Sequence, residues 1–512
     1  MTNKLYLIGI DSAPLWMVRN NIRERRLRGF ESLLGNGVLM DLESTMPPMT
    51  GPSWPSIYTG FKPGEHGVPE FQRMERNYSK SVVFYDPSIR PPFWDMMAEH
   101  GLRSLVVTPA MLVKPSAEKN VDMITGFPLP AKFSSPWVRG IAMRHSYKGE
   151  PDEIEMKMKR GEYTLAQGAH DYLKGIEKRV AVSKELMAKK DYDMSFICFT
   201  EQDRMQHFAL GRPEWKEYVM PLYEAISDFM LWVEARAERE RATVMVVSDH
   251  GGQPIREKLL MNGWLIGKGY AHLQGAIEKE LESASAAGSL RYNIRERVLK
   301  SVQRGGSRKV LYDRLPPALK GVAKSTISRL LPGVGQGDYV RIHDFDLDMG
   351  RTRAFASIAN CPVATIYIND GRFDHGIVSA KEKPALKRRI MRELLGIKGK
   401  DGKPIIIKTY DADRYYEGTK LFIAPDIFAE AREGYLLDSF GYLKSGGLFM
   451  APEAAKSGDH LRNGIFGVLS YGERLDYRAI AKRKLYVYNI EPTIMKYFGL
   501  EPRNDKRYGP IF

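Results

Sequence analysis

Carboxylate and imidazole side chains follow three apolar segments of the sequence. The segments are residues 4–10, 194–199 and 243–248, and each has the apolar, partly β-branched composition of a buried strand. The polar residues that follow them are Asp11, Asp203, His207, Asp249 and His250. Because ligands of open α/β sheets collect at the carboxyl ends of the strands, we expect these side chains to share one edge of a sheet.

This set of side chains has the chemistry of a metal site. Carboxylate oxygens and neutral imidazole nitrogens are suitable ligands for zinc or manganese. Several carboxylates buried together would repel one another unless cations neutralise them. Each residue alone also has a structural explanation, because Asp is common at helix caps and turns. The ordered combination favours a metal site, and Gly251 and Gly252 would let the backbone turn sharply beneath it.

The elements around these residues indicate an α/β protein. Residues 91–110 have the pattern of a helix, a stop at Gly101 and a strand at 104–108. Helical periodicity covers residues 163–190 and 213–240. The chain has 512 residues, so we expect one large domain with an insertion, or two to three domains.

Composition excludes some classes of protein. No segment reaches the ~18 uncharged apolar residues that a membrane span needs. The two cysteines, Cys198 and Cys361, provide no disulfide framework. The first apolar run, in MTNKLYLIGIDS, is shorter than the ~7–15-residue core of a signal peptide. We therefore expect a cytoplasmic protein.

The net charge of +15 indicates an anionic partner, which could be a phosphorylated substrate, nucleic acid or a membrane surface. Much of the excess lies in residues 290–330, which hold eleven Lys and Arg residues against two acidic ones. A charge run of this kind is often only a solvated surface. An amphipathic arm on an acidic membrane would instead suit a lipid-derived substrate. Nucleic acid is the less favoured partner.

Five ordered motifs resemble those of the alkaline phosphatase superfamily. They are GID, PPMTGPSWPSIYTGFKPGEHGV, EQDRMQH, SDHGG and SGDHLRNGIF. The most similar branch is that of the type I phosphodiesterases and nucleotide pyrophosphatases, in its microbial form. The resemblance implies a three-layer α/β/α core with a mostly parallel central sheet. Residues 1–255 would form its first part, 256–340 a basic inserted cap or arm, and 341–512 the second part that completes the metal site.

The resemblance also implies two divalent metal ions, usually zinc, with manganese as the alternative. One ion would be bound by Asp203, His207 and His460. The other would be bound by Asp11, Asp249 and His250, with the hydroxyl of Thr50 as an additional ligand. His66 lies in a family-like turn, and we interpret it as structural.

Thr50 is the nucleophile that the resemblance implies. Its hydroxyl is too weak to attack a phosphodiester unaided, and metal coordination would lower its pKa. The sequence TGPSWPS predicts that Thr50 is the N-cap of a short helix, where free N–H groups favour a phosphate. Thr50 would displace the leaving alcohol and become phosphorylated, and the phosphothreonine would then be hydrolysed.

The residues three and four positions after Thr50 depart from the pattern of nucleotide pyrophosphatases, which carry Asn and His at these positions. This chain has Ser53 and Trp54. Ser53 could still donate one hydrogen bond to a phosphate oxygen. Trp54 could line the substrate pocket by stacking, or it could belong to the core. We therefore name both as candidate substrate-binding residues.

The function that this pattern predicts is a metal-dependent phosphodiesterase that acts on a phosphorylated small molecule or a lipid-derived phosphodiester. A phosphomonoesterase or phosphotransferase of the same superfamily is the alternative. A different class would be an inactive protein that binds anions or nucleic acid, which the complete set of predicted ligands disfavours. The segment around Thr50 lacks the Cys-x-Pro-x-Arg pattern of sulfatases.

Overall fold

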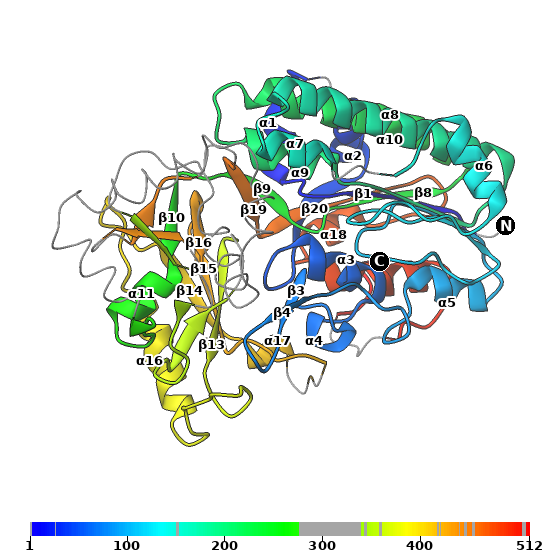
Figure 1. Cartoon of the computed structure of the whole chain (residues 1–512). Coiled ribbons are helices and arrows are strands. Elements are labelled where there is room, and N and C mark those ends of the chain that lie inside the picture. The colour runs from blue at the N-terminus through cyan, green and yellow to red at the C-terminus, as the bar shows by residue number, and fades with distance from the viewer. Residues whose placement is uncertain are drawn as a thin grey trace, which may run out of the picture.

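A computed structural model represents the protein (Figure 1). The structure describes residues 3–25, 27–149, 153–275, 339–342, 346–357, 361–416, 419, 421–439, 441–444, 448–452, 456–503 and 508–512. The basic segment 290–330 therefore lies outside the described residues, as does most of the predicted insertion. The predicted boundaries at 256 and 340 stay predictions.

A seven-stranded sheet forms the centre of the larger lobe. β20 runs antiparallel to both of its neighbours, β2 and β8, and the other neighbouring strands of this sheet are parallel. In spatial order the strands are β2 (Val38–Glu43), β20 (Asn463–Ser470), β8 (Thr243–Val247), β1 (Leu5–Ile10), β7 (Met194–Phe199), β5 (Ser104–Val107) and β6 (Val121–Ile124). All residues of β1, β7 and β8 are buried, which explains why their sequences are continuous apolar runs.

Helices cover both faces of this sheet (Figure 1). On one face lie α1 (Leu15–Asn21), α2 (Arg28–Asn36), α6 (Pro136–Arg144), α7 (Glu153–Lys159), α8 (Leu165–Lys189), α9 (Glu201–Ala209) and α10 (Trp215–Glu240). On the other lie α3 (Thr50–Thr59), α4 (Pro63–His66), α5 (Phe93–Glu99), α18 (Tyr477–Ala481), η2 (Val487–Asn489) and α19 (Ile490–Tyr497). The predicted three-layer α/β/α core with a mostly parallel sheet is therefore confirmed.

A second, smaller lobe is built from the described residues between 257 and 450. Its largest sheet has the order β12 (Ala354–Ala356), β13 (Val363–Ile368), β15 (Ile427–Ala431) and β14 (Ile406–Asp411). The other elements are β10 (Glu257–Leu260), α11 (Met261–Gly267), β11 (Tyr339–Ile342), α16 (Lys383–Leu394), α17 (Asp413–Tyr416), β16 (Tyr435–Asp438), β17 (Gly441–Lys444) and β18 (Phe449–Met450). This lobe has a hydrophobic core of its own, around Leu259, Ile366 and Ile427.

The lobes are connected and packed together near the carboxyl edge of the central sheet. The ribbon of β9 (Gly251–Pro254) and β19 (Gly458–Leu461) leads out of and back into the larger lobe. The loop before α3 packs on the smaller lobe, where Met46 and Met49 share an apolar cluster with Tyr416. The hydroxyl of Tyr416 donates to the carbonyl oxygen of Met46 at 2.9 Å.

Among the remaining short elements, one contacts the smaller lobe through Tyr78, whose ring stacks on Phe373 with centroids 5.1 Å apart. A hairpin of β3 (Gln72–Met74) and β4 (Lys80–Val82) projects beside α3 and α4 (Figure 1). The predicted stop at Gly101 is confirmed, since α5 ends at Glu99 and Gly101 has a φ of 80°. No helix among the described residues combines the length and the apolar character that a bilayer span requires.

Candidate metal centre

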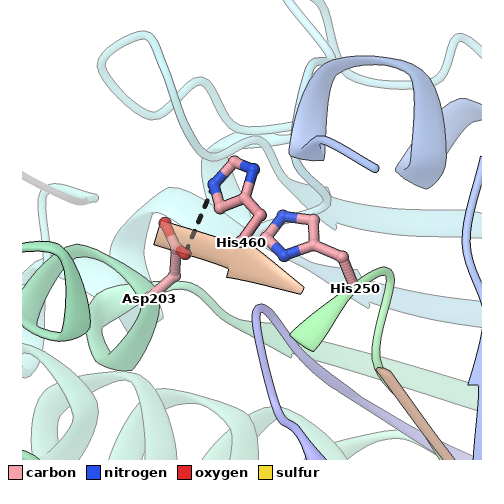
Figure 2. A group of neighbouring side chains, drawn as sticks. All are labelled: Asp203, His250 and His460. Atoms are coloured by element: carbon pink, nitrogen blue, oxygen red, sulfur yellow. Dashed lines mark ion pairs between the residues drawn. The ribbon is translucent and has the colours of Figure 1, made fainter. Parts of the chain in front are cut away.

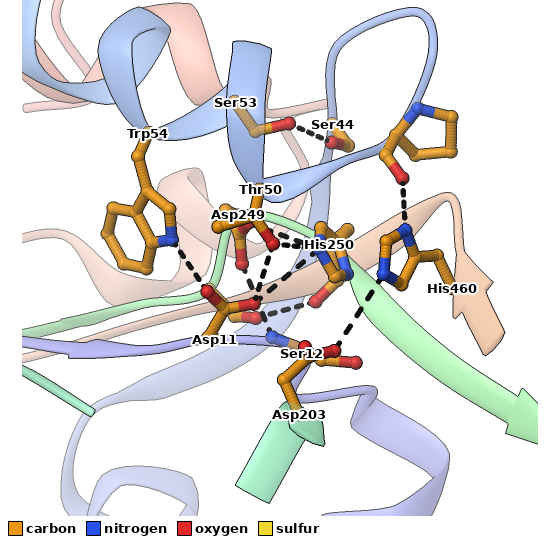
Figure 3. A network of polar contacts seen from close by, with 12 residues as sticks. Asp11, Ser12, Ser44, Thr50, Ser53, Trp54, Asp203, Asp249, His250 and His460 are labelled. Carbon is orange, nitrogen blue, oxygen red and sulfur yellow. Dashed lines mark hydrogen bonds and ion pairs between the residues drawn. The ribbon is translucent and has the colours of Figure 1, made fainter. Parts of the chain in front are cut away.

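The end of β1 lies between the ends of β7 and β8, because β1 is the strand between them in the sheet. Asp11 follows β1 directly, and Asp249 and His250 follow β8. Asp203 and His207 lie on α9, which begins two residues after β7 ends. These five side chains meet at one edge of the sheet, as the strand ends predict. Figure 3 shows four of them, Asp11, Asp203, Asp249 and His250.

His460 reaches the same place from the far end of the chain. It lies on β19, which pairs with β9 so that His460 is opposite Gly252. The side-chain amide of Gln253 donates to the carbonyl oxygen of His460 at 2.9 Å. The ribbon passes close to α9, because a Cβ on Gly252 would lie 2.3 Å from Oε1 of Gln206. A side chain at Gly252 would therefore displace the amide of Gln206, which contacts the carbonyl oxygen of Ser12.

One group of candidate ligands consists of Asp11, Asp249 and His250, whose ligand atoms all lie within 4.8 Å of one another. Nε2 of His250 is 3.5 Å from Oδ1 of Asp11 and 3.2 Å from Oδ2 of Asp249. The backbone N–H of Ser12 donates to Oδ1 of Asp249 at 3.3 Å. All three candidate ligands are buried.

A second group consists of Asp203, His250 and His460, again within 4.8 Å of one another (Figure 2). Nε2 of His460 is 3.8 Å from Oδ1 of Asp203. Nε2 of His207 is 3.5 Å from the other oxygen of Asp203, and the His207 side chain is 23% exposed. The two groups share His250, so they adjoin, and His207 lies at the solvent side of the second group.

Backbone carbonyls hold the three imidazoles in one tautomer. Nδ1 of His207 donates to Gly458 at 3.1 Å, Nδ1 of His250 donates to Gly251 at 3.1 Å, and Nδ1 of His460 donates to Pro48 at 3.0 Å. In the neutral form of each ring Nε2 therefore lacks the proton, and it faces a carboxylate. Metal-binding histidines characteristically use their second nitrogen in this way.

The charges of the cluster also fit a cation site. Burial raises the pKa of Asp249 well above its usual range, and repulsion by Asp203 raises it further. Burial has the same tendency at Asp203, but attraction by His207, His460 and His250 lowers its pKa. Burial and the neighbouring His460 lower the pKa of His250 to about 3. Burial also lowers the pKa of His460, whereas Asp203 raises the pKa of His207 against the effect of burial. Neutral imidazoles at His250 and His460 beside crowded carboxylates are a donor set that divalent cations stabilise.

Thr50 lies inside this cluster. Its Oγ1 is 3.4 Å from Oδ1 of Asp11 and 3.2 Å from Nε2 of His250, and the residue is 3% exposed. Thr50 is the first residue of α3, and the N-cap is Met49. The predicted N-cap therefore lies one residue too late, and the Thr50 hydroxyl faces the candidate ligands instead of capping the helix.

A sequence profile described as type I phosphodiesterase / nucleotide pyrophosphatase matches residues 5–439. The chain belongs to this family. The proteins of the type I phosphodiesterase/nucleotide pyrophosphatase family are phosphoester hydrolases, and this chain is one of them. No curated protein matches the sequence significantly.

Solved structures of phosphonoacetate hydrolase support the fold of this phosphodiesterase-family chain. Phosphonoacetate hydrolase from Sinorhizobium meliloti, in complex with phosphonoacetate, has a TM-score of 0.54 and 15% identity, over 96% of this chain and 94% of that chain. Its complex with phosphonoformate gives a TM-score of 0.53 and 14% identity over the same shares. Human ectonucleotide pyrophosphatase / phosphodiesterase 5 has a TM-score of 0.45 and 12% identity, over 98% of this chain and 97% of that chain.

Ser53, where the pyrophosphatase pattern has Asn, is fully buried. Its hydroxyl forms hydrogen bonds with the hydroxyls of Ser44 at 2.8 Å and Thr45 at 2.7 Å (Figure 3). These contacts anchor α3 to the preceding loop. A contact between Ser53 and substrate stays a prediction that these distances do not support.

Trp54, where the pattern has His, is also fully buried. Its indole packs on Tyr58 and Phe196, with ring centroids 6.0 and 6.1 Å away. Of the two interpretations of Trp54, the core residue agrees with this burial, and the stacking contact with substrate does not. The indole N–H nevertheless reaches the candidate site, where it donates to Oδ2 of Asp11 at 3.0 Å.

The sequence-based interpretation missed two glutamines that hold α9 against the end of β1. The amide of Gln202 donates to the carbonyl oxygen of Asp11 at 2.7 Å, and the amide of Gln206 donates to that of Ser12 at 2.8 Å. Both lie in the motif EQDRMQH, on the helix that carries Asp203 and His207. The sequence could have indicated them, because both are polar residues in a motif that directly follows a buried strand.

Proposed function

We propose that this phosphoester hydrolase is a metal-dependent phosphodiesterase that works through a phosphothreonine at Thr50. Asp203, His207 and His460 would bind one divalent ion. Asp11, Asp249 and His250 would bind the second, with Thr50 as its fourth ligand. Zinc is the favoured metal, because the donor set combines imidazole with carboxylate, and manganese is the alternative.

The observation that supports this function most is the position of the Thr50 hydroxyl. It lies within hydrogen-bonding range of both Asp11 and His250. A hydroxyl that only stabilised the helix would bond to a backbone group of α3. Instead, Thr50 is placed where cations bound by its neighbours would lower the pKa of its hydroxyl and offset the charge of a phosphate.

The chain itself supplies the remaining parts of the reaction. The start of α3 presents the amides of Thr50 and Gly51 to an anion, since the first α-helical bond runs from Ser53 to Met49. In the first step the Oγ1–P bond forms, the bond from phosphorus to the leaving alcohol breaks, and the proton lost by the Thr50 hydroxyl is balanced by one gained by that alcohol. In the second step water attacks phosphorus, the Oγ1–P bond breaks, and Thr50 regains its proton.

The test uses bis(p-nitrophenyl) phosphate with the purified full chain and added zinc or manganese. We expect turnover by the wild type, its loss in Thr50→Ala, and unchanged metal content in that variant by elemental analysis. Thr50→Ser keeps a hydroxyl and is the matched control, with measurable turnover and a phosphoserine detectable by mass spectrometry after acid quenching. Undiminished turnover by Thr50→Ala would falsify the proposed nucleophile.

The same assay separates the other candidate functions. Turnover of p-nitrophenyl phosphate alone would indicate a phosphomonoesterase of the same superfamily. A chain that binds no divalent ion and hydrolyses neither ester would be the inactive anion-binding protein. A panel of nucleotides, glycerophosphodiesters and sugar nucleotides then identifies the substrate class.

A further inference from the structure

Trp54 lies one helical turn after Thr50 on α3. Its indole is enclosed by aromatic rings on the face of the sheet opposite α8 and α10. A buried indole N–H requires an acceptor, because leaving it unpaired costs ~1–3 kcal/mol. Here the acceptor is the carboxylate of Asp11, and no neutral carbonyl takes that place.

One helix therefore contacts both oxygens of Asp11 (Figure 3). The hydroxyl of Thr50 is 3.4 Å from Oδ1, and the indole N–H of Trp54 is 3.0 Å from Oδ2. Oδ1 is also the oxygen that faces Nε2 of His250, at 3.5 Å. The carboxylate is thus rotated so that one oxygen is directed toward the candidate ligands and the other toward the core.

A glycine in β1 makes room for this indole. A Cβ on Gly9 would lie 2.7 Å from Cη2 of Trp54 and 2.9 Å from Cε2 of Phe196. Both distances are shorter than side-chain contacts in proteins allow, so alanine at this position would displace the ring. Gly9 lies two residues before Asp11 in the motif GID, which couples the small residue to the carboxylate that the ring orients.

We propose that Trp54 is a positioning residue for metal binding, which holds the Asp11 carboxylate with Oδ1 turned toward the candidate ligands. This inference rests on the proposed function, which assigns Asp11 as a ligand. An indole suits the task because it only donates and does not titrate, so it cannot itself compete for the metal. Outer partners of this kind orient ligating side chains, and their loss commonly lowers metal affinity by about 10- to 100-fold.

The test compares Trp54→Phe with Trp94→Phe. Trp94 is also fully buried and packs on the same two rings, Tyr58 and Phe196, so it is a control for lost aromatic packing. Zinc affinity is measured by competition with a chromogenic chelator, and thermal stability by circular dichroism. We expect Trp54→Phe to bind one of the two zinc ions about tenfold or more weakly than the wild type. Trp94→Phe should bind both zinc ions as tightly as the wild type, although its Tm falls by a similar amount.

A second replacement covers the case in which Trp54→Phe does not fold. Trp54 alone is replaced by 3-benzothienylalanine, in which sulfur takes the place of the indole N–H at nearly unchanged shape. The same loss of zinc affinity is expected, with little change in Tm. Unchanged affinity in this protein would overturn the positioning role while the proposed function stands. A wild type that binds no zinc would instead overturn the proposed function, and this inference with it.

Discussion

Nδ1 of His460 lies 3.0 Å from the carbonyl oxygen of Pro48, two residues before Thr50. His460 lies on β19, and this strand is anchored to α9 by two hydrogen bonds. The N–H of Ser457, directly before β19, donates to the carbonyl oxygen of His207 at 2.8 Å, and Nδ1 of His207 donates to the carbonyl oxygen of Gly458. The strand that carries His460 therefore connects the loop before Thr50 to the helix of Asp203. Folding of this strand and formation of the candidate site are coupled.

The first prediction concerns His460. Replacement by Ala removes a proposed ligand and breaks the link to Pro48, so metal content should fall from two ions to about one per chain. Diesterase activity should fall by more than the roughly 10- to 100-fold that is typical when a residue that only orients a metal ligand is lost. Elemental analysis and kinetics check this. His145→Ala is the control, because His145 pairs with Glu185 away from the site. Two retained ions in His460→Ala would contradict the assignment.

The second prediction concerns metal removal. Asp249 is fully buried, Asp203 is mostly buried, and the two carboxylates repel each other, so bound cations should stabilise the folded chain markedly. A ligand at 100 times its Kd adds about 2.7 kcal/mol for each site. We expect chelation to lower Tm and zinc to restore it, with a smaller rise in Asp249→Asn. Asp228→Asn, on the exposed side of α10, should respond like the wild type. An equal zinc response in Asp249→Asn would count against this ligand.

The third prediction concerns the base of α9. Arg179 and Glu201 form a fully buried two-point ion pair, with N–O distances of 2.8 and 2.7 Å. Glu201 is the first residue of the helix that carries Asp203 and His207. Arg179→Met leaves a buried carboxylate without this partner and should cost about 3–5 kcal/mol, whereas Arg179→Met with Glu201→Leu should cost less. Thermal unfolding measures both, and equal costs would show that the pair is not coupled.

Much of the candidate site could be predicted from strand ends alone. Asp11 and Asp249 follow buried strands that are neighbours in a parallel sheet. The apolar pattern of these strands was therefore sufficient to predict that the two carboxylates lie at the same edge. His460 could not be predicted in this way. It reaches the site because β19 pairs with β9, a contact between segments more than 200 residues apart. Only the resemblance to a family distinguished it from the other histidines.

The second lobe shows a further limit of sequence patterns. The apolar pattern after residue 352 indicates strands, but it does not indicate which sheet those strands join. Pairing decides this, and β13 joins β12 and β15 in a sheet separate from the central one. The role of Trp54 was equally undetermined, because an indole has an apolar body and a polar N–H, and only its neighbours decide which of them matters.

The fourth prediction concerns the basic segment 290–330, which lies outside the described residues and is argued from its charge alone. Its excess of Lys and Arg should favour acidic membranes by about 1 kcal/mol for each residue near the surface. We expect the full chain to float with vesicles that contain phosphatidylserine but not with neutral vesicles. A deletion of 290–330 should abolish this difference, and flotation of both proteins alike would exclude the segment as a membrane contact.

The last prediction concerns pH and a carboxyl group remote from the candidate site. Glu491 on α19 is fully buried, and burial raises its pKa from 4.5 to about 8, although Arg503 lowers it in part. Below about pH 4.5 the group is neutral in both the folded and the unfolded chain. Between about pH 4.5 and 8 the unfolded chain has already lost this proton, whereas the folded chain retains it.

The folded state therefore binds more protons over this window, and the free energy of unfolding falls as the pH rises through it. Glu491→Gln keeps the shape of the protonated side chain and cannot ionise. We expect the variant to match the wild type in Tm near about pH 4.5 and to exceed it increasingly up to about pH 8. Thermal unfolding across this range measures the difference between the two proteins. A difference that is constant with pH would mean that Glu491 ionises in the folded chain at its ordinary pKa.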